Sequence, residues 1–132
     1  MKNVHEYLRM LGEDSVLILS KNNEEIYRSV GEGLKPLIEA LGKVRGEIVV
    51  DRVIGAAAAF LIVALDAEEV YSRVISSRGV KILEANRIRW EALRLVRSIL
   101  KEGKECPFER AVRGVKDPYK AIKRILEVYE GE

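Results

Sequence analysis

The sequence contains a single cysteine, Cys106, and a single histidine, His5, among its 132 residues. One cysteine cannot form an intramolecular disulfide, which suits a reducing compartment. The longest uncharged apolar run, Val53 to Leu65, is shorter than the roughly 20 residues that cross a bilayer, so we interpret it as a buried helix. Met1 to Glu6 is not followed by the apolar core of a signal peptide. We therefore expect a cytoplasmic protein that makes no contact with a membrane.

Glutamine and threonine are absent altogether, and only three residues are proline. Lys, Arg, Glu, Val and Ile are abundant instead, a bias typical of proteins adapted to heat. Hydrophobic residues make up 48% of the chain and charged residues 33%, which is too apolar for a disordered chain. A chain of this length is expected to form one domain, residues 1–132, around a single core.

Neither sign of charge dominates overall, since the formal net charge is +2. The balance hides an asymmetry, because residues 78–124 carry 14 Lys and Arg against 6 Asp and Glu. A basic half can indicate an anionic partner such as nucleic acid. In a chain this rich in ionised residues, an ordinary charged surface is the favoured interpretation.

Hydrophobic periodicity and turn residues predict alternating strands and helices. This alternation favours the α/β class, with a mixed sheet covered on both faces as a three-layer α/β/α sandwich. The first two strands form an N-terminal β-hairpin, and the third and fourth are joined by a parallel crossover. The predicted strands are 15–20, 25–30, 47–50 and 69–75, and the predicted helices are 3–11, 34–41, 54–65, 80–85, 91–100 and one that begins at Asp117-Pro118.

Four stretches resemble one known family. They are Val49 to Ala58 (VVDRVIGAAA), Gly33 to Leu37 (GLKPL), Ser76 after the fourth strand, and Cys106 to Glu109 (CPFE). Together they resemble a family of small prokaryotic proteins with a domain of unknown function, DUF1893, across nearly the whole chain. The resemblance implies a cytidine-deaminase-like fold and a pocket, but no particular activity.

The zinc ligands of the deaminases are missing from this sequence. Such enzymes need a His or Cys from an H-x-E motif and two Cys from P-C-x-x-C, because only the metal makes the attacking water reactive. The corresponding positions read Asp51 to Gly55 and Ser76 to Gly79, with no ligand of this kind. We therefore expect no metal and no cofactor, and a zinc-dependent deaminase is excluded.

Asp51 lies where the third strand is predicted to end and the buried helix to begin. Gly55 would let a ligand or a backbone come close, and the helix start could accept an anion, with Arg52 offsetting the charge of Asp51. Ser76 and Ser77 follow the fourth strand, so we expect them to converge with Asp51 at the carboxyl edge of the sheet. The alternative interpretation is that Asp51 and Ser76 only cap helices.

Two further positions extend the candidate site. Lys35 could point into the pocket that the deaminase-like fold implies. Cys106 could act as a nucleophile if a base made it a thiolate, although a free cysteine is more often a small buried hydrophobe. Glu109 is interpreted as an acid at a helix start.

An aromatic residue with several cations marks the predicted helix 91–100 and its flanks. Trp90, Arg94, Arg97 and Lys101 would share one helical face, which could stack on bases and neutralise phosphates. A solvated face is the more common outcome for such a pattern.

Three hypotheses follow for function. The leading one is a metal-free domain that binds a small, nucleotide-like ligand through Asp51, Arg52, Gly55, Ser76, Ser77 and Lys35. The second is a metal-independent enzyme that uses Asp51 or Cys106, and the third is a nucleic-acid-binding module that uses the basic half. A homo-oligomer is compatible with each of them.

Overall fold

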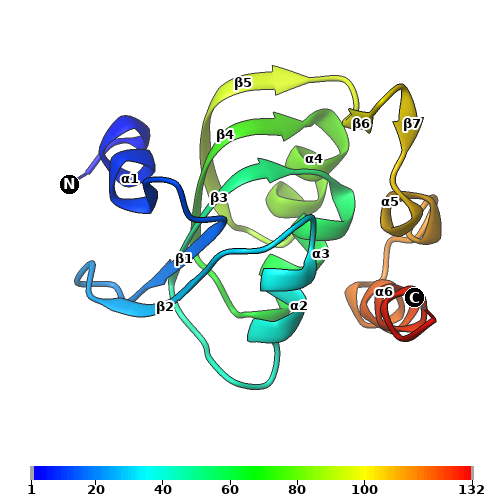
Figure 1. Cartoon of the computed structure of the whole chain (residues 1–132), viewed down its shortest axis with the longest axis horizontal. Coiled ribbons are helices and arrows are strands. Elements are labelled where there is room, and N and C mark those ends of the chain that lie inside the picture. Colours follow the sequence, from blue (N-terminus) through cyan, green and yellow to red (C-terminus); the bar gives the residue numbers. More distant parts are fainter. Residues whose placement is uncertain (1, 132) are drawn as a thin grey trace.

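The computed structural model describes residues 2–131, apart from the side chain of Lys101. One sheet contains five strands in the order β2-β1-β3-β4-β5 (Figure 1). β1 pairs antiparallel with β2 and with β3, whereas β3, β4 and β5 run parallel. The elements in chain order are α1 (Val4–Leu11), β1 (Val16–Leu19), β2 (Glu25–Ser29), α2 (Lys35–Ala40), β3 (Ile48–Ile54), α3 (Ala56–Ala64), β4 (Glu69–Ser76), α4 (Ser77–Ala85), β5 (Arg89–Val96), β6 (Leu100–Lys101), β7 (Lys104–Glu105), α5 (Pro107–Ala111) and α6 (Pro118–Glu130).

Helices cover both faces of the sheet, which makes the molecule a three-layer α/β/α sandwich with an N-terminal hairpin, as the sequence predicts. On one face, α1 buries Tyr7 and Leu11 against strand residues, and the ring of Tyr7 stacks on Tyr71 at 4.1 Å between centroids. The opposite face carries the larger core, centred on α3, whose residues Ala56 to Ile62 are all buried. α3 is apolar all round because α2, α4, α5 and α6 pack on it beyond the sheet.

The prediction of a helix over 91–100 is wrong. Residues Arg89 to Val96 form β5, which pairs with β4 along its length. Leu, Ala, Arg and Glu favour helices, but helix propensity is a weak local preference that sheet pairing overrides. Trp90 and Ala92 pack against the core, while their neighbours Glu91 and Leu93 are exposed. The expected helical face of Trp90, Arg94, Arg97 and Lys101 therefore does not exist.

Two other differences affect the region around Asp51. β3 continues to Ile54 rather than ending at Val50, so Asp51 lies inside the strand. α4 begins at Ser77, directly after β4, rather than at Val80. The short strands β6 and β7 were not predicted, whereas the helix start expected at Glu109 is confirmed, because Glu109 lies in the first turn of α5. Among the described residues, no helix is both long enough and apolar enough to span a membrane.

Candidate functional site

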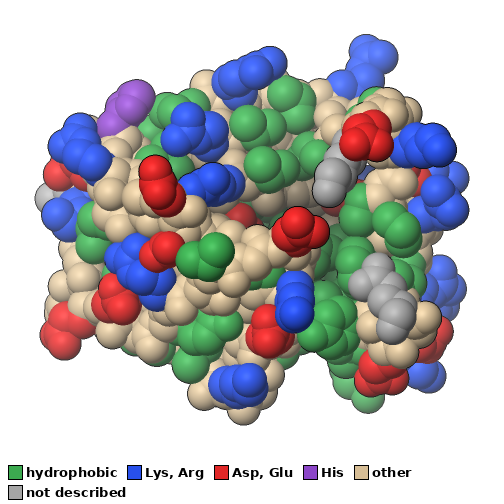
Figure 2. Space-filling model, in the orientation of Figure 1, with side chains coloured by type: hydrophobic (Ala, Val, Ile, Leu, Met, Phe, Trp, Pro, Cys, Tyr) green, Lys and Arg blue, Asp and Glu red, His purple; other side chains and the backbone are tan. Residues whose placement is uncertain are grey.

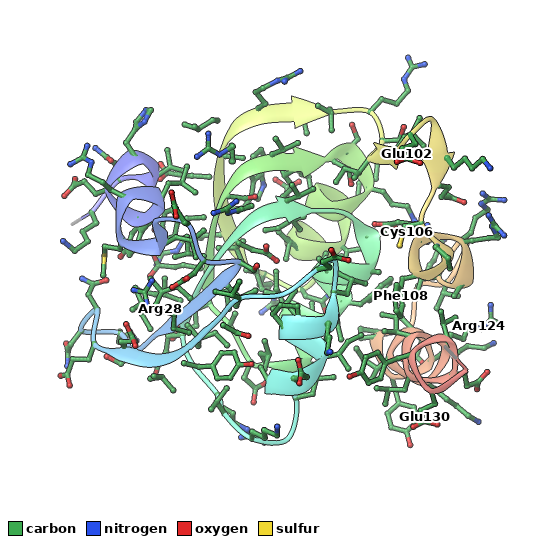
Figure 3. All side chains as sticks on the ribbon, viewed as in Figure 1. Arg28, Glu102, Cys106, Phe108, Arg124 and Glu130 are labelled. Atoms are coloured by element: carbon green, nitrogen blue, oxygen red, sulfur yellow. The ribbon has the colours of Figure 1, made fainter. Side chains whose placement is uncertain are left out.

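A cavity of about 370 Å³ opens where β3 gives way to α3. Its walls come from β3, from the loop after β2, from the start of α3 and from the C-terminal segment before and within α5. Cys106 lies at the junction of β7 and α5, on the side that faces the end of β3 (Figure 3). The molecular surface is hollowed beside the C-terminal segment, and hydrophobic side chains gather in the hollow (Figure 2). The lining residues are Ser15, Gly31, Gly33, Leu34, Asp51, Arg52, Val53, Gly55, Ala58, Ile99, Cys106 and Glu109.

Asp51 is the buried acid of this cavity, with an exposed fraction of 9%. Its position in β3 is opposite Val16 of β1 and Ser72 of β4. Burial raises the pKa of its carboxyl from 3.8 to about 7, because a charged carboxylate is poorly solvated there. The N–H groups of Arg52 and Val53 and the charge of Arg52 act in the opposite direction but do not cancel the effect of burial. Near neutral pH, the group therefore interconverts between a hydrogen-bond donor and a pure acceptor.

Arg52 lines the cavity, but its guanidinium is already engaged. Its Nε donates to the carbonyl oxygen of Asp14 at 2.9 Å and its Nη2 to that of Gly12 at 3.3 Å. These contacts fasten β3 to the turn between α1 and β1. Arg52 is therefore committed to the scaffold, and a ligand would have to displace these bonds to recruit it.

Glu109 occupies the start of α3. The N–H group of Ala57 donates to its Oε1 at 3.4 Å, although the two residues lie on different helices. α3 begins after Gly55, which has no side chain to cap it, so Glu109 supplies the cap from α5. Burial raises the pKa of the Glu109 carboxyl, and the Ala57 N–H and the nearby charge of Arg78 reduce that rise.

A side chain at position 55 would displace the carboxyl of Glu109 from the start of α3. An added Cβ would lie 1.8 Å from Oε1 of Glu109 and 2.9 Å from its Cδ. Gly55 has φ −99°, which any residue adopts, so the requirement is for room and not for an unusual backbone. The anion expected at this helix start is thus the protein's own carboxylate. Asp51 does not cap α3, because Gly55 is the N-cap residue.

The predicted convergence of Asp51 with Ser76 and Ser77 is not found. Ser76 caps α4, its Oγ accepting from the N–H of Gly79 at 3.0 Å, and the Ser77 hydroxyl donates to the carbonyl of Val96 at 3.3 Å. Neither serine lines the cavity. Because β3 continues past Asp51, the serine beside it is Ser72. Its buried hydroxyl has one proton, which can go to the carbonyl of Val74 at 2.8 Å or to that of Arg52 at 3.1 Å.

Lys35 and Cys106 have different positions relative to the cavity. Cys106 is half-buried and lines both this cavity and an adjoining cleft of about 610 Å³. Lys35 lines only the adjoining cleft. Of the predicted site residues, Asp51, Arg52, Gly55 and Cys106 therefore share one cavity. Within the described part of the chain, no three His, Cys, Asp or Glu side chains are grouped so that they could hold a metal ion.

Sequence reasoning missed the role of Glu109 at this site. A signal was nevertheless present, because a long apolar helix that starts after glycine lacks the Ser, Thr, Asp or Asn that usually caps such a start. A helix end buried without a local partner must be satisfied from elsewhere in the chain. Which distant acid does so depends on tertiary packing.

Gly55→Ala is expected to lower the free energy of unfolding by about 1–2 kcal/mol, because the new methyl group displaces the flexible carboxyl of Glu109 from its capping position. Glu109→Ala removes the cap and lowers it by about 1 kcal/mol. In the double variant the losses do not add, with a coupling energy of about 1–2 kcal/mol, because the clash needs both side chains. Urea unfolding of all four proteins measures this coupling. The control is a second cycle that combines Gly55→Ala with Glu102→Ala, because Glu102 is an exposed acid of the same segment and its loss should add to that of Gly55→Ala. A coupling energy of equal size in the two cycles would contradict the contact between Gly55 and Glu109.

The raised pKa of Asp51 makes stability depend on pH. The unfolded chain loses this proton near pH 3.8, whereas the folded protein keeps it up to about pH 7. Between these values the folded state binds more protons, so the free energy of unfolding falls as pH rises from about 4 to about 7 and then levels off. Asp51→Asn removes this contribution, so its stability relative to the parent should rise over the same range by a few kcal/mol, at most about 1.4 kcal/mol per pH unit. Parallel stability curves for the two proteins, measured by urea unfolding from pH 4 to pH 8, would contradict the assignment.

The comparisons with known proteins agree on one family. Residues 6–129 match the family described as a domain of unknown function, DUF1893. A crystal structure of a DUF1893 family protein from Thermotoga maritima is similar to this chain, with 26% sequence identity and a TM-score of 0.84. The match covers 95% of this chain and 88% of the Thermotoga chain. No protein with curated function matches. This chain therefore belongs to the DUF1893 family.

Proposed function

We propose that the cavity around Asp51 binds a small nucleoside-like ligand that is neutral or cationic. The observation that carries the proposal is the presence of two carboxyl groups with raised pKa, Asp51 and Glu109, in the wall of one cavity. Titratable groups perturbed by burial and gathered in a cleft are typical of functional sites. The volume of about 370 Å³ is within the range of small-molecule sites.

The composition of the walls indicates which ligand chemistry fits. Arg52 is the only cationic side chain among the described residues of the wall, and it is bonded to backbone carbonyls. The carboxyl groups of Asp51 and Glu109 therefore favour a ligand with N–H or O–H donors. A carboxyl that is neutral part of the time also donates, so Asp51 complements the adjacent donor and acceptor of a nucleobase edge. Leu34, Val53 and Ile99 provide apolar contacts for a ring.

The same argument disfavours a phosphate in this cavity. The start of α3 would be the natural place for an anion, but Glu109 already accepts the Ala57 N–H there. A phosphate beside Asp51 and Glu109 would meet like charges. The nucleoside part of a nucleotide is therefore the portion that this cavity suits.

We propose further that the domain is a metal-free relative of the cytidine deaminases. The order of a hairpin, a helix, and then strand, helix and strand is the layout of that fold, and Gly55 begins the helix at the corresponding position. In this chain a carboxylate, Glu109, lies at that helix start. A carboxylate at this helix start, where the deaminases carry zinc ligands, is consistent with a domain that binds its ligand without zinc.

Thermal unfolding with a panel of nucleosides and nucleobases tests the proposal. A compound present at 100 times its dissociation constant adds about 2.7 kcal/mol, which should raise the midpoint by several degrees. Asp51→Asn should weaken that ligand at least tenfold, since the carboxyl group is lost. Asp66→Asn is the matched control, because Asp66 is an exposed acid outside the cavity, and it should leave the shift unchanged. A shift of equal size in all three proteins, or no shift with any compound, would contradict the proposal.

A second candidate function is metal-independent catalysis, because Cys106 lines the same cavity as Asp51. A carboxyl with pKa about 7 is suited to accept or donate a proton near neutral pH. In this case iodoacetamide should alkylate Cys106 faster than free cysteine, with a rate that follows the titration of Asp51 and falls in Asp51→Asn. A rate no higher than that of free cysteine, with no effect of Asp51→Asn, would argue against this candidate.

A further inference from the structure

A second cavity of about 340 Å³ lies away from Asp51, between α4 and the loop that joins α5 to α6. Its lining shares no residue with the cavity of Asp51. We propose that it binds a small organic phosphate, an apolar ring that carries a phosphate monoester. This site is separate from the proposed nucleoside site and does not depend on it.

Three cations surround the second cavity, and one of them, Arg78, also acts electrostatically on the acid Glu109. Arg78, Lys81 and Lys116 line it, and no Asp or Glu does. None of these three takes part in the ion pairs found among residues 2–131. Two unpaired lysines, together with Arg78, whose charge Glu109 offsets in part, favour a dianion at this opening. A phosphate monoester carries close to two negative charges at neutral pH.

The acids closest in sequence are already engaged. Asp117, beside Lys116, accepts the N–H of Tyr119 at 3.1 Å and caps α6. Glu84, on α4, accepts the Nε1–H of Trp90 at 3.2 Å. Neither carboxylate lines the cavity. Lys81 and Lys116 are therefore available to an anion from outside, whereas one nitrogen of Arg78 is already bonded to the carbonyl of Val112.

Arg78 gives the site a fixed element. Its guanidinium donates to the carbonyl of Val112 and is only partly exposed, so it is held more firmly than a surface lysine. Arg78 also lies in the first turn of the nine-residue helix α4, where the N-terminal end of the dipole is positive. The carbonyl end of α4 lies at Asn86, at the other end of the lining. The phosphate is therefore expected near Arg78, and the apolar body toward Ala85.

The floor of the cavity is apolar. Phe60 of α3, with an exposed fraction of 1%, lies at its base, and the half-buried Ile82 and Val115 line it as well. An inorganic ion would leave this surface without a partner. A ring bound there would bury it, which adds a favourable hydrophobic contribution to the ion pairing. Cations at the opening and an apolar floor together favour a ligand that carries both a phosphate and an apolar ring.

Calorimetry at low salt with three probes tests the proposal: 1-naphthyl phosphate, inorganic phosphate and 1-naphthol. The naphthyl phosphate should bind at least tenfold more tightly than either fragment. Equal affinity for inorganic phosphate would overturn the role of the apolar floor, and equal affinity for 1-naphthol would overturn the role of the cations. Undetectable binding of 1-naphthyl phosphate would overturn the whole proposal.

Variants locate the site. Lys81→Gln/Lys116→Gln should weaken 1-naphthyl phosphate at least tenfold, while both changes are at exposed positions and should leave the thermal unfolding midpoint nearly unchanged. Lys43→Gln is the matched control, since Lys43 is exposed and lies outside this cavity. Asp51→Asn should also bind the probe normally. Loss of binding in Lys43→Gln or Asp51→Asn equal to that in the double variant would overturn the assignment to this cavity.

Discussion

The contact between Glu109 and the start of α3 is the interaction on which the candidate site depends. It brings α5 against the carboxyl end of β3 and closes the wall that contains Cys106. It also favours glycine at position 55, since a Cβ there would push the carboxyl away from the start of α3. One arrangement therefore accounts for a helix with no cap of its own, for the glycine at its start and for the half-buried acid Glu109.

The burial of Asp51 has a cost in stability. Its burial disfavours the ionised form, so the folded state is less stable at neutral pH than an uncharged residue would make it. A purely structural role does not require a charged residue here. Ser72, the neighbour of Asp51 on β4, shows that an uncharged residue can be buried at this level of the sheet with its hydroxyl bonded to the backbone. Residues that lower stability and line a cavity are typical of ligand-binding or catalytic sites.

The layers, the hairpin and the central apolar helix were predictable, because they follow from periodicity and turn residues that act locally. β5 was not, since Arg89 to Val96 contains good helix formers and becomes a strand only through pairing with β4. The candidate site divides in the same way. Asp51, Gly55 and Cys106 were identified from sequence, whereas the place of Ser72 depended on where β3 ends, and the role of Glu109 on packing between segments distant in sequence.

The distance in sequence between the two ends of the Glu109 contact bears on how the chain assembles. Ala57 and Glu109 are 52 positions apart, so the first turn of the most buried helix cannot be completed by its neighbours. During synthesis α3 and the five strands of the main sheet are made before α5. The core helix thus keeps an open end until the C-terminal segment docks, and long-range closure of this kind slows folding. The segment that completes the first turn of α3 is also the segment that closes one wall of the cavity, so the core and the candidate site share one long-range contact.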